Sequence, residues 1–236
     1  MHRVLFFVLV VSFLGAGCNT NKDKSFEGDP ASLYPDYQVT GKEGDDNVTI
    51  LLQYRLGNKN GNGVNLGPGA KVSLDGELIE VDSTKKNGYF YELNKSADAF
   101  VGHHVISFSI GDKEAYKEEF DFKPLTLLHE FPAEIYRLND TSKSLTLEIA
   151  DYKPQYPVTL LLTDTSVNNG FNRLDTVHNG ILLLRYADLK QLTTGPVLME
   201  LVREEERILK SSPRSGRLLI TFSLKREFIL TDQVKP

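Results

Sequence analysis

From about residue 46 onward, apolar residues recur at every second position, and this alternation constrains the fold more than any other feature of the chain. One face of the first such segment carries four large side chains: Val48, Ile50, Leu52 and Tyr54. The residues between them are more polar. Because successive side chains of a β-strand point to opposite sides, this pattern is typical of a strand with one buried face. The same alternation returns in residues 104–110 and 116–122.

Turn signals separate these alternating segments. Asp75-Gly76 lies between two runs of β-forming residues, and Asn87-Gly88 precedes the strand-like run Tyr89-Phe90-Tyr91. Both dipeptides favour the tight turns of β-hairpins, in which the two central residues need positive φ. Short strands at this spacing, with turns between them, indicate antiparallel β-sandwiches. The chain is therefore predicted to be all-β.

The order of strands and turns repeats in the second half of the chain. Residues 144–149 match the first strand, and residues 160–164 match the strand that ends at Asp75. Asn179-Gly180 and Gly195-Pro196-Val197 then match Asn87-Gly88 and Gly102-His103-His104 with nearly the same offset. A repeat of this size indicates tandem domains. Pro124 is the expected junction, which gives β-sandwiches at 41–124 and 125–236.

The module of Asn-Gly, an apolar strand and then Gly-x-His-x-apolar resembles the E–F corner of bacterial immunoglobulin-like and fibronectin type III-like domains. The resemblance covers nearly all of residues 40–230 and implies two tandem antiparallel sandwiches. It implies no particular function, because such folds host many. The antibody-type core of two cysteines and a tryptophan is absent, since the chain has one Cys and no Trp. Residues 186–192 could form one or two helical turns, but a crossing between sheets is the preferred interpretation.

The N-terminus has the composition of an export signal. Residues 1–17 begin with Met-His-Arg, continue as an apolar run over 4–14 and end in Gly15-Ala16-Gly17. This order is that of a secretory signal peptide. The apolar run is shorter than the roughly 20 residues that a spanning helix needs. We expect cleavage between Gly17 and Cys18.

Residues 14–18, Leu-Gly-Ala-Gly-Cys, resemble the lipobox of bacterial lipoproteins, in which the cysteine becomes the lipidated first residue. Gly15 departs from the pattern, since the family usually has Leu there. The resemblance implies palmitate-like acyl chains on Cys18, and two or three such chains anchor stably at about 0.8 kcal/mol per buried CH₂. By resemblance to the enterobacterial sorting rule, Asn19 favours the outer membrane.

Residues 18–40 are expected to form the lipidated Cys and a flexible tether. Residues 19–37 show no hydrophobic period and contain Gly28, Pro30 and Pro35. The charged run Lys22-Asp23-Lys24 loosely resembles surface-export signals of Bacteroidota lipoproteins. Two locations therefore follow from these resemblances: the periplasmic face of the outer membrane and the cell surface.

Motifs of catalysis and metal binding are missing from the sequence. Neither a phosphate loop nor a Gly-x-Ser-x-Gly elbow occurs, and His129-Glu130 lacks the second His of a zinc motif. His103 and His104 are adjacent, so in a strand they point to opposite faces, one packed and one exposed. His178 beside the second Asn-Gly turn is expected to be exposed. We predict no enzyme, no metal and no cofactor, and the net charge of -5 excludes the basic surface of a nucleic-acid binder.

Two polar stretches are the candidates for contact with a partner. They are the loop Gly57–Gly69 and the mixed-charge link that begins at Arg203, and the simplest interpretation of both is a solvated loop. Loops at the end of a sandwich are where such folds place binding surfaces. The six residues singled out are Asn60, Asn62, Asn65, Glu205, Arg207 and Arg214. Asn and Asp oxygens near residues 45–47 and 57–63 could attract Ca²⁺, but they lack an ordered ligand spacing.

The sequence thus predicts a membrane-anchored envelope lipoprotein, non-catalytic, whose tandem sandwiches act as a spacer or a protein-binding module. The alternative is a glycan-binding surface lipoprotein of a polysaccharide-uptake system. Sandwiches that bind glycans commonly use exposed aromatic platforms. Trp is absent here, and Tyr89 and Tyr91 occupy positions that alternation assigns to the core.

Overall fold

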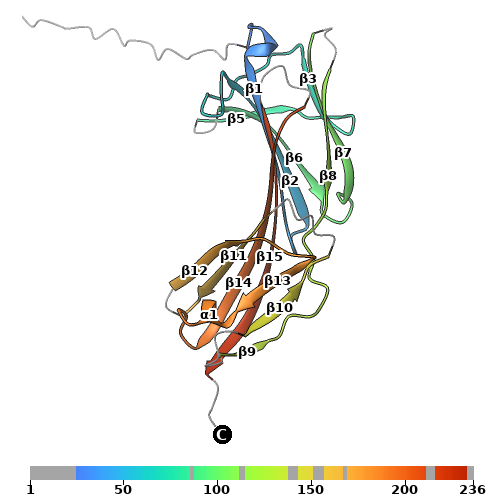
Figure 1. Cartoon of the computed structure of the whole chain (residues 1–236). Helices are drawn as coiled ribbons and strands as arrows, with labels where there is room; N and C mark the ends of the chain where they lie inside the picture. Colours follow the sequence, from blue (N-terminus) through green and yellow to red (C-terminus); the bar gives the residue numbers. More distant parts are fainter. Residues whose placement is uncertain are drawn as a thin grey trace, which may run out of the picture.

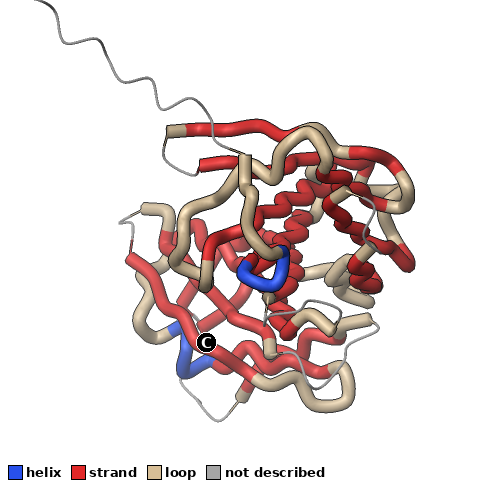
Figure 2. Tube along the Cα trace, turned by 90° about the horizontal axis from the view of Figure 1, so that it is seen from above, coloured by secondary structure: helices blue, strands red, loops and turns tan. Residues whose placement is uncertain are grey.

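The computed structural model describes residues 25–85, 88–111, 115–137, 143–150, 157–166, 169–210 and 216–232. Strands dominate this part of the chain, and its helical turns are short: η1 (Pro30–Ser32) and α1 (Tyr186–Leu189) (Figures 1 and 2). The predicted all-β fold of antiparallel sandwiches is confirmed. Gly17 and Cys18, with the rest of the expected signal peptide, lie outside the described residues.

The first sandwich has two facing sheets. One sheet contains β1 (Leu33–Lys42), β2 (Asn47–Leu56), β6 (Gly88–Ser96) and β5 (Val81–Thr84), in that spatial order. The other contains β4 (Glu77–Leu78), β3 (Ala70–Leu74), β7 (Gly102–Ile110) and β8 (Tyr116–Phe122). Every neighbouring pair among these strands is antiparallel.

The second sandwich is built in the same way. Its small sheet pairs β10 (Ser144–Glu148) with β13 (Ile181–Arg185). Its larger sheet contains β12 (Asn169–Asp175), β11 (Val158–Asp164), β14 (Gly195–Ile208), β15 (Arg217–Asp232) and β9 (Glu134–Arg137). The helical turn α1 follows β13 and lies in the crossing that leads to β14 in the other sheet.

The repeat inferred from the sequence is present in the strand pairing. The pair β2–β6 of the first sandwich corresponds to β10–β13 of the second, and the row β3–β7–β8 corresponds to β11–β14–β15. The predicted matches of residues 144–149 with the first strand, and of Gly195 with Gly102, fall on equivalent strands.

Strand β15 belongs to both sandwiches. It pairs with β14 from Arg217 to Leu230, and its last residues pair with β9. Its first residues pair in parallel with β1, from Asp36↔Arg217 to Lys42↔Ser223. A nine-stranded sheet therefore runs through both sandwiches, and Figure 1 shows β14 and β15 extending from one into the other. The division at residues 124/125 stays a prediction, but the sheet crosses it.

Buried side chains form an interior that extends through both sandwiches. Ile50 and Leu52 on β2 are fully buried in the first, as are Leu160 and Leu162 on β11 in the second. Where the sandwiches meet, the rings of Phe122 and Phe222 lie 6.0 Å apart. These residues follow the alternation that the sequence predicted, because one face of each sheet is turned inward.

Two of the predicted hairpin turns have the required backbone. Asp75 and Gly76 have φ of 51° and 85°, and Asn179 and Gly180 have φ of 52° and 77°. Asn and Asp tolerate positive φ better than other residues with side chains, which explains their place before glycine. Asn87, in the third predicted turn, lies outside the described residues.

The tether is shorter than the sequence indicated. Residues 33–40, which were expected to belong to it, form β1, and Val39 is fully buried. Pro35 argued against a strand with neighbours on both sides. It is tolerated because the pairing of β1 with β15 begins one residue later, at Asp36. Gly216 lies against this proline, and a Cβ there would be 2.5 Å from the Pro35 carbonyl oxygen.

Candidate functional site

The first predicted contact loop lies at the outer end of the first sandwich. Asn60 and Asn62 are exposed, whereas Asn65 is half-buried. Asn60 N donates to Asn58 Oδ1 over 2.9 Å, and Asn65 Oδ1 accepts from Gly67 N over 2.9 Å. Asn65 O accepts from Phe26 N, which fastens the start of the described chain to this loop. The loop is therefore structured, and contact with a partner stays a prediction.

The second predicted loop is wrong in part. Glu205 and Arg207 lie in β14, which continues to Ile208, and the connection to β15 begins only after that residue. Arg214 lies outside the described residues. The charged run continues the alternation of Val197, Met199 and Leu201, with Arg203 still 8% exposed. These charged residues were expected to face solvent. In the structure, Arg203 and Arg207 instead contact polar groups of the first sandwich.

Those partners are on β8 and at Lys123, the residue that follows it. Arg207 Nη1 lies 2.7 Å from Glu118 Oε1, and Arg207 Nη2 donates to the Glu119 carbonyl oxygen. Arg203 Nη2 donates to the Lys123 carbonyl oxygen. Glu118 is only 3% exposed, and its Oε2 also accepts from Lys210 N over 3.0 Å. These contacts close one side of the first sandwich by linking β8 to β14.

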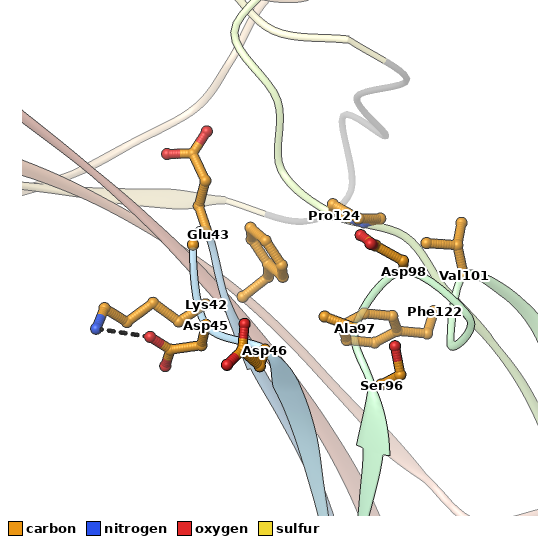
Figure 3. A pocket seen from close by; sticks show the side chains of 12 residues that line it. Lys42, Glu43, Asp45, Asp46, Ser96, Ala97, Asp98, Val101, Phe122 and Pro124 are labelled. Carbon is orange, nitrogen blue, oxygen red and sulfur yellow. Dashed lines mark hydrogen bonds and ion pairs between the residues drawn. The ribbon is translucent and has the colours of Figure 1, made fainter.

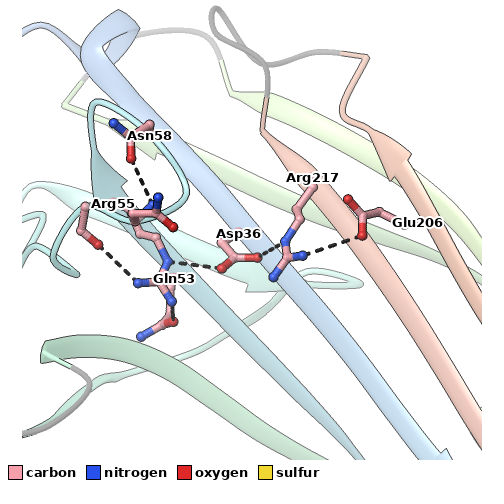
Figure 4. Close-up of polar contacts among 8 residues, drawn as sticks. Asp36, Gln53, Arg55, Asn58, Glu206 and Arg217 are labelled. Atoms are coloured by element: carbon pink, nitrogen blue, oxygen red, sulfur yellow. Dashed lines mark hydrogen bonds and ion pairs between the residues drawn. The ribbon is translucent and has the colours of Figure 1, made fainter.

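A second polar network crosses the outer face of the shared sheet (Figure 4). Its centre is Asp36, which is 2% exposed. Asp36 Oδ2 accepts from Arg55 Nε over 3.0 Å, and Asp36 Oδ1 accepts from Arg217 Nε over 2.7 Å. Arg55 also donates to Gln53 and to Gly61 O, and Arg217 lies 3.5 Å from Glu206. The network therefore joins β2, β1, β15 and β14.

The charges in this network stabilise one another. The hydrogen bond to Asp36 raises the pKa of Arg217 above its ordinary value, with smaller contributions from the charges of Asp36 and Glu206. A buried carboxylate is costly unless it is paired and hydrogen-bonded, and Asp36 has two guanidinium partners. No sequence pattern predicted this site, because residues 19–37 were expected to form a tether.

A pocket of about 440 Å³ lies where the two sandwiches meet (Figure 3). Its walls come from the turn after β1, the connection between β6 and β7, the end of β8 and an interior residue of β15, Phe222. The apolar lining includes Val101, Phe122, Pro124 and Phe222, and the acidic lining is Glu43, Asp45, Asp46 and Asp98.

Several of the acidic side chains of this pocket are already paired. Lys42 Nζ lies 3.2 Å from Asp45 Oδ1, and Arg226 Nη2 donates to Glu43 Oε1 over 2.9 Å. Ser96 supplies a hydroxyl, but no histidine lines the pocket. No group of three or more metal-ligating side chains occurs among the described residues.

His103 and His104 contact neighbouring side chains of the first sandwich. His104 is buried and stacks on Phe100 at a centroid distance of 3.8 Å, with Nδ1 2.8 Å from Asp75 Oδ2. His103 is exposed beside Asp121, which confirms that the two adjacent rings face opposite ways. His178 is also exposed, as predicted. None of these histidines lines the junction pocket.

A less polar pocket of about 360 Å³ lies at the end of the second sandwich away from the first. Ala133, Pro196, Phe228 and Ile229 contribute to its lining. Ile229 is 45% exposed and Tyr136 on neighbouring β9 is 52% exposed. This end of the molecule therefore offers apolar surface of the kind that protein contacts use.

No protein-family model matches the chain, and no curated protein matches it either. No helix among the described residues is long and apolar enough to span a bilayer.

Solved structures that the chain matches with low TM-scores include a tandem repeat, an adhesin and a pair of IG domains. A tetra-tandem repeat from the extending region of a large adhesion protein is 14% identical, with a TM-score of 0.28, over 83% of this chain and 50% of that one. The adhesin InvE of Yersinia pseudotuberculosis is 16% identical, with a TM-score of 0.25, over 83% and 61%. DIP-gamma IG1+IG2 is 14% identical, with a TM-score of 0.22, over 81% and 97%. The chain spans about half the length of the first of these, and TM-scores this low do not bear on function.

Proposed function

We propose that the chain is a membrane-anchored envelope lipoprotein without catalytic activity. In this proposal Cys18 carries the lipid, and the two sandwiches act as a spacer that presents a protein-binding end. The lipobox-like residues 14–18 support the anchor. The described residues add one feature, a lengthwise arrangement of the two sandwiches (Figure 1).

The observation that carries the proposal is the shared strand β15. Tandem sandwiches joined only by a linker move relative to each other by default. Here β15 pairs with β1 in the first sandwich and with β14 and β9 in the second. A continuous sheet resists bending between the two, which is the property that a spacer needs.

The proposed arrangement places the anchor and the contact surface at opposite ends. The described chain begins beside the 57–69 loop at the outer end of the first sandwich, where Phe26 N donates to Asn65 O. The apolar pocket around Phe228 lies at the other end, near the end of β15 (Figure 1). A partner bound there would be held away from the membrane by the length of both sandwiches.

The alternative, glycan binding, has little support from the tyrosines. Tyr91 is 6% exposed and Tyr37 is 3% exposed, and Tyr89 is half-buried, so none of the three forms an open stacking platform. Reproducible micromolar binding on a glycan array would nevertheless replace the spacer proposal.

The anchor is tested by expressing the full chain and its Cys18→Ala variant in a bacterial host and fractionating the cells. We expect the parent protein in the membrane fraction, with an intact mass that shows acyl chains on a chain beginning at Cys18. The variant should lose the acyl chains and leave the membrane. An unmodified thiol at Cys18 in the membrane-associated parent protein would contradict the proposal. Asn19→Asp is the matched variant for the choice of membrane, because it keeps the lipidation site.

A further inference from the structure

The first and last strands of the described chain, β1 and β15, lie side by side in the middle of the shared sheet and run in the same direction. β1 begins at Leu33 and β15 ends at Asp232, and seven register pairs join them from Asp36↔Arg217 to Lys42↔Ser223. In Figure 1 both strands run from the first sandwich towards the second. The chain therefore enters β1 at one end of the molecule and leaves β15 at the other.

We propose that β1 and β15 form a clamp that resists tension between the membrane anchor and the far end of the molecule. This proposal extends the anchored-spacer function and relies on it for the source of the tension. The partner class is any structure that holds the second sandwich while the membrane holds residue 18.

The direction of pulling explains why this pair is suited to the task. Tension pulls β1 towards its N-terminal end and β15 towards its C-terminal end, so the two strands are forced to slide past each other. In a parallel pair the hydrogen bonds are evenly spaced along the strands. Sliding strains all of them together, whereas separation from one end breaks them one after another. The force needed to start unfolding is therefore higher for sliding.

Neighbouring contacts strengthen the clamp. β1 is also paired with β2 over eight register positions, so it cannot slide without breaking contacts on both sides. Arg217 binds Asp36 at the upper end of the overlap, and Arg226 binds Glu43 just beyond its lower end. Glu43 N donates to Ser223 O over 2.8 Å, which extends the backbone pairing. Val39 and Ile220, which face each other in the middle, are both buried.

Single-molecule force spectroscopy on the non-lipidated mature chain tests the clamp. The thiol of Cys18, the chain's single cysteine, takes the first handle. The second handle is attached either to a cysteine added after Pro236 or to Lys210→Cys, at an exposed position between β14 and β15. The first pair of handles makes β1 and β15 slide. The second pulls both strands from their upper ends and separates them pair by pair.

We expect the first unfolding force to be about twofold higher, or more, in the sliding geometry, because forced unfolding follows the unfolding rate along the direction of pulling. Equal forces in the two geometries would overturn the proposal. So would a first event in the sliding geometry that releases only the second sandwich while β1 stays paired.

Two variants distinguish a mechanical role of the β1–β15 contact from a general effect of lost ion pairs on stability. Arg217→Gln removes the contact with Asp36 inside the overlap, whereas Arg173→Gln removes ion pairs with Asp175 and Asp188 in the second sandwich. We expect a loss of force in the sliding geometry for Arg217→Gln and none for Arg173→Gln. Equal losses in both variants would contradict the clamp. Because the test uses the protein without lipid, its failure would leave the anchor at Cys18 untouched, and failure of lipidation would leave the measured force unchanged.

Discussion

Asp36 on β1 and Arg217 on β15 are register partners in a parallel pair, and Arg217 Nε donates to Asp36 Oδ1 across 2.7 Å. The two residues are far apart in the sequence and belong to different halves of it. Their contact joins the first strand of the first sandwich to the last strand of the second.

Asp36→Asn should lower the free energy of unfolding by about 2 to 3 kcal/mol, because it leaves the guanidinium groups of Arg55 and Arg217 without their shared carboxylate. Urea denaturation followed by circular dichroism measures the change. Asp45→Asn is the matched control, since the Lys42–Asp45 pair is exposed and should contribute less than about 1 kcal/mol. Equal losses in the two variants would show that the Asp36 network does not hold β15 to β1.

Gly41→Ala should destabilise the junction of the sandwiches. A Cβ at Gly41 would lie 2.6 Å from Phe122 Cζ and 3.0 Å from Phe222 Cδ2, so these rings would have to move. Overpacking of this kind typically costs about 1 to 3 kcal/mol. Gly69→Ala is the control, because the nearest atom to its added Cβ is 3.8 Å away. A change below about 0.5 kcal/mol is expected there, and the same small change at Gly41 would argue against tight packing at the junction.

Stability should fall in alkaline solution because of two buried tyrosines. The hydroxyls of Tyr37 and Tyr54 lie 3.1 Å apart in the core, and burial raises the pKa of each well above the ordinary value of 10.0. Above pH 10 the unfolded chain loses these protons and the folded chain keeps them. The stabilisation is therefore complete below that pH and is lost as the pH rises further towards the folded pKa values.

Urea denaturation at a series of pH values from about 9 to about 11 checks this alkaline loss. The double variant Tyr37→Phe and Tyr54→Phe should show a weaker dependence on pH than the parent protein. Tyr136→Phe should weaken the dependence less than the double variant does, because Tyr136 is exposed and its pKa is raised mainly by its hydrogen bond with Glu134. Phenolate absorbance of Tyr37 and Tyr54 that appears before unfolding would contradict their burial.

The strands and turns could be predicted from the sequence because both signals are local. The alternation of Val48, Ile50 and Leu52 depends only on the period of a strand, and Asp75-Gly76 depends only on backbone preference. The repeat of this order along the chain then indicated two equivalent sandwiches, and the pairing of β10 with β13 agrees with it.

The shared sheet and its polar networks could not be predicted in this way. Pro35 and Asp36 interrupt the hydrophobic alternation of β1. Arg217, which pairs with the buried Asp36 carboxylate, is distant in the sequence. Arg203 and Arg207 resembled a solvated loop because their partners, Lys123 and Glu118, are equally remote in the sequence. One feature of the sequence did indicate a strand here: Arg203 and Arg207 fall on the same every-second-residue pattern as Val197 and Leu201. Alternation thus predicts that a strand continues, even where charge suggests that it ends.

Strand sharing should make the two sandwiches a single structural unit, and native-state hydrogen exchange tests this most directly. Leu162→Ala creates a cavity in the second sandwich, at a fully buried position that should cost about 2 to 5 kcal/mol. We predict that the amides of β2, in the first sandwich, lose the same opening free energy as those of β11. Unchanged protection of β2 beside weakened protection of β11 would contradict the claim.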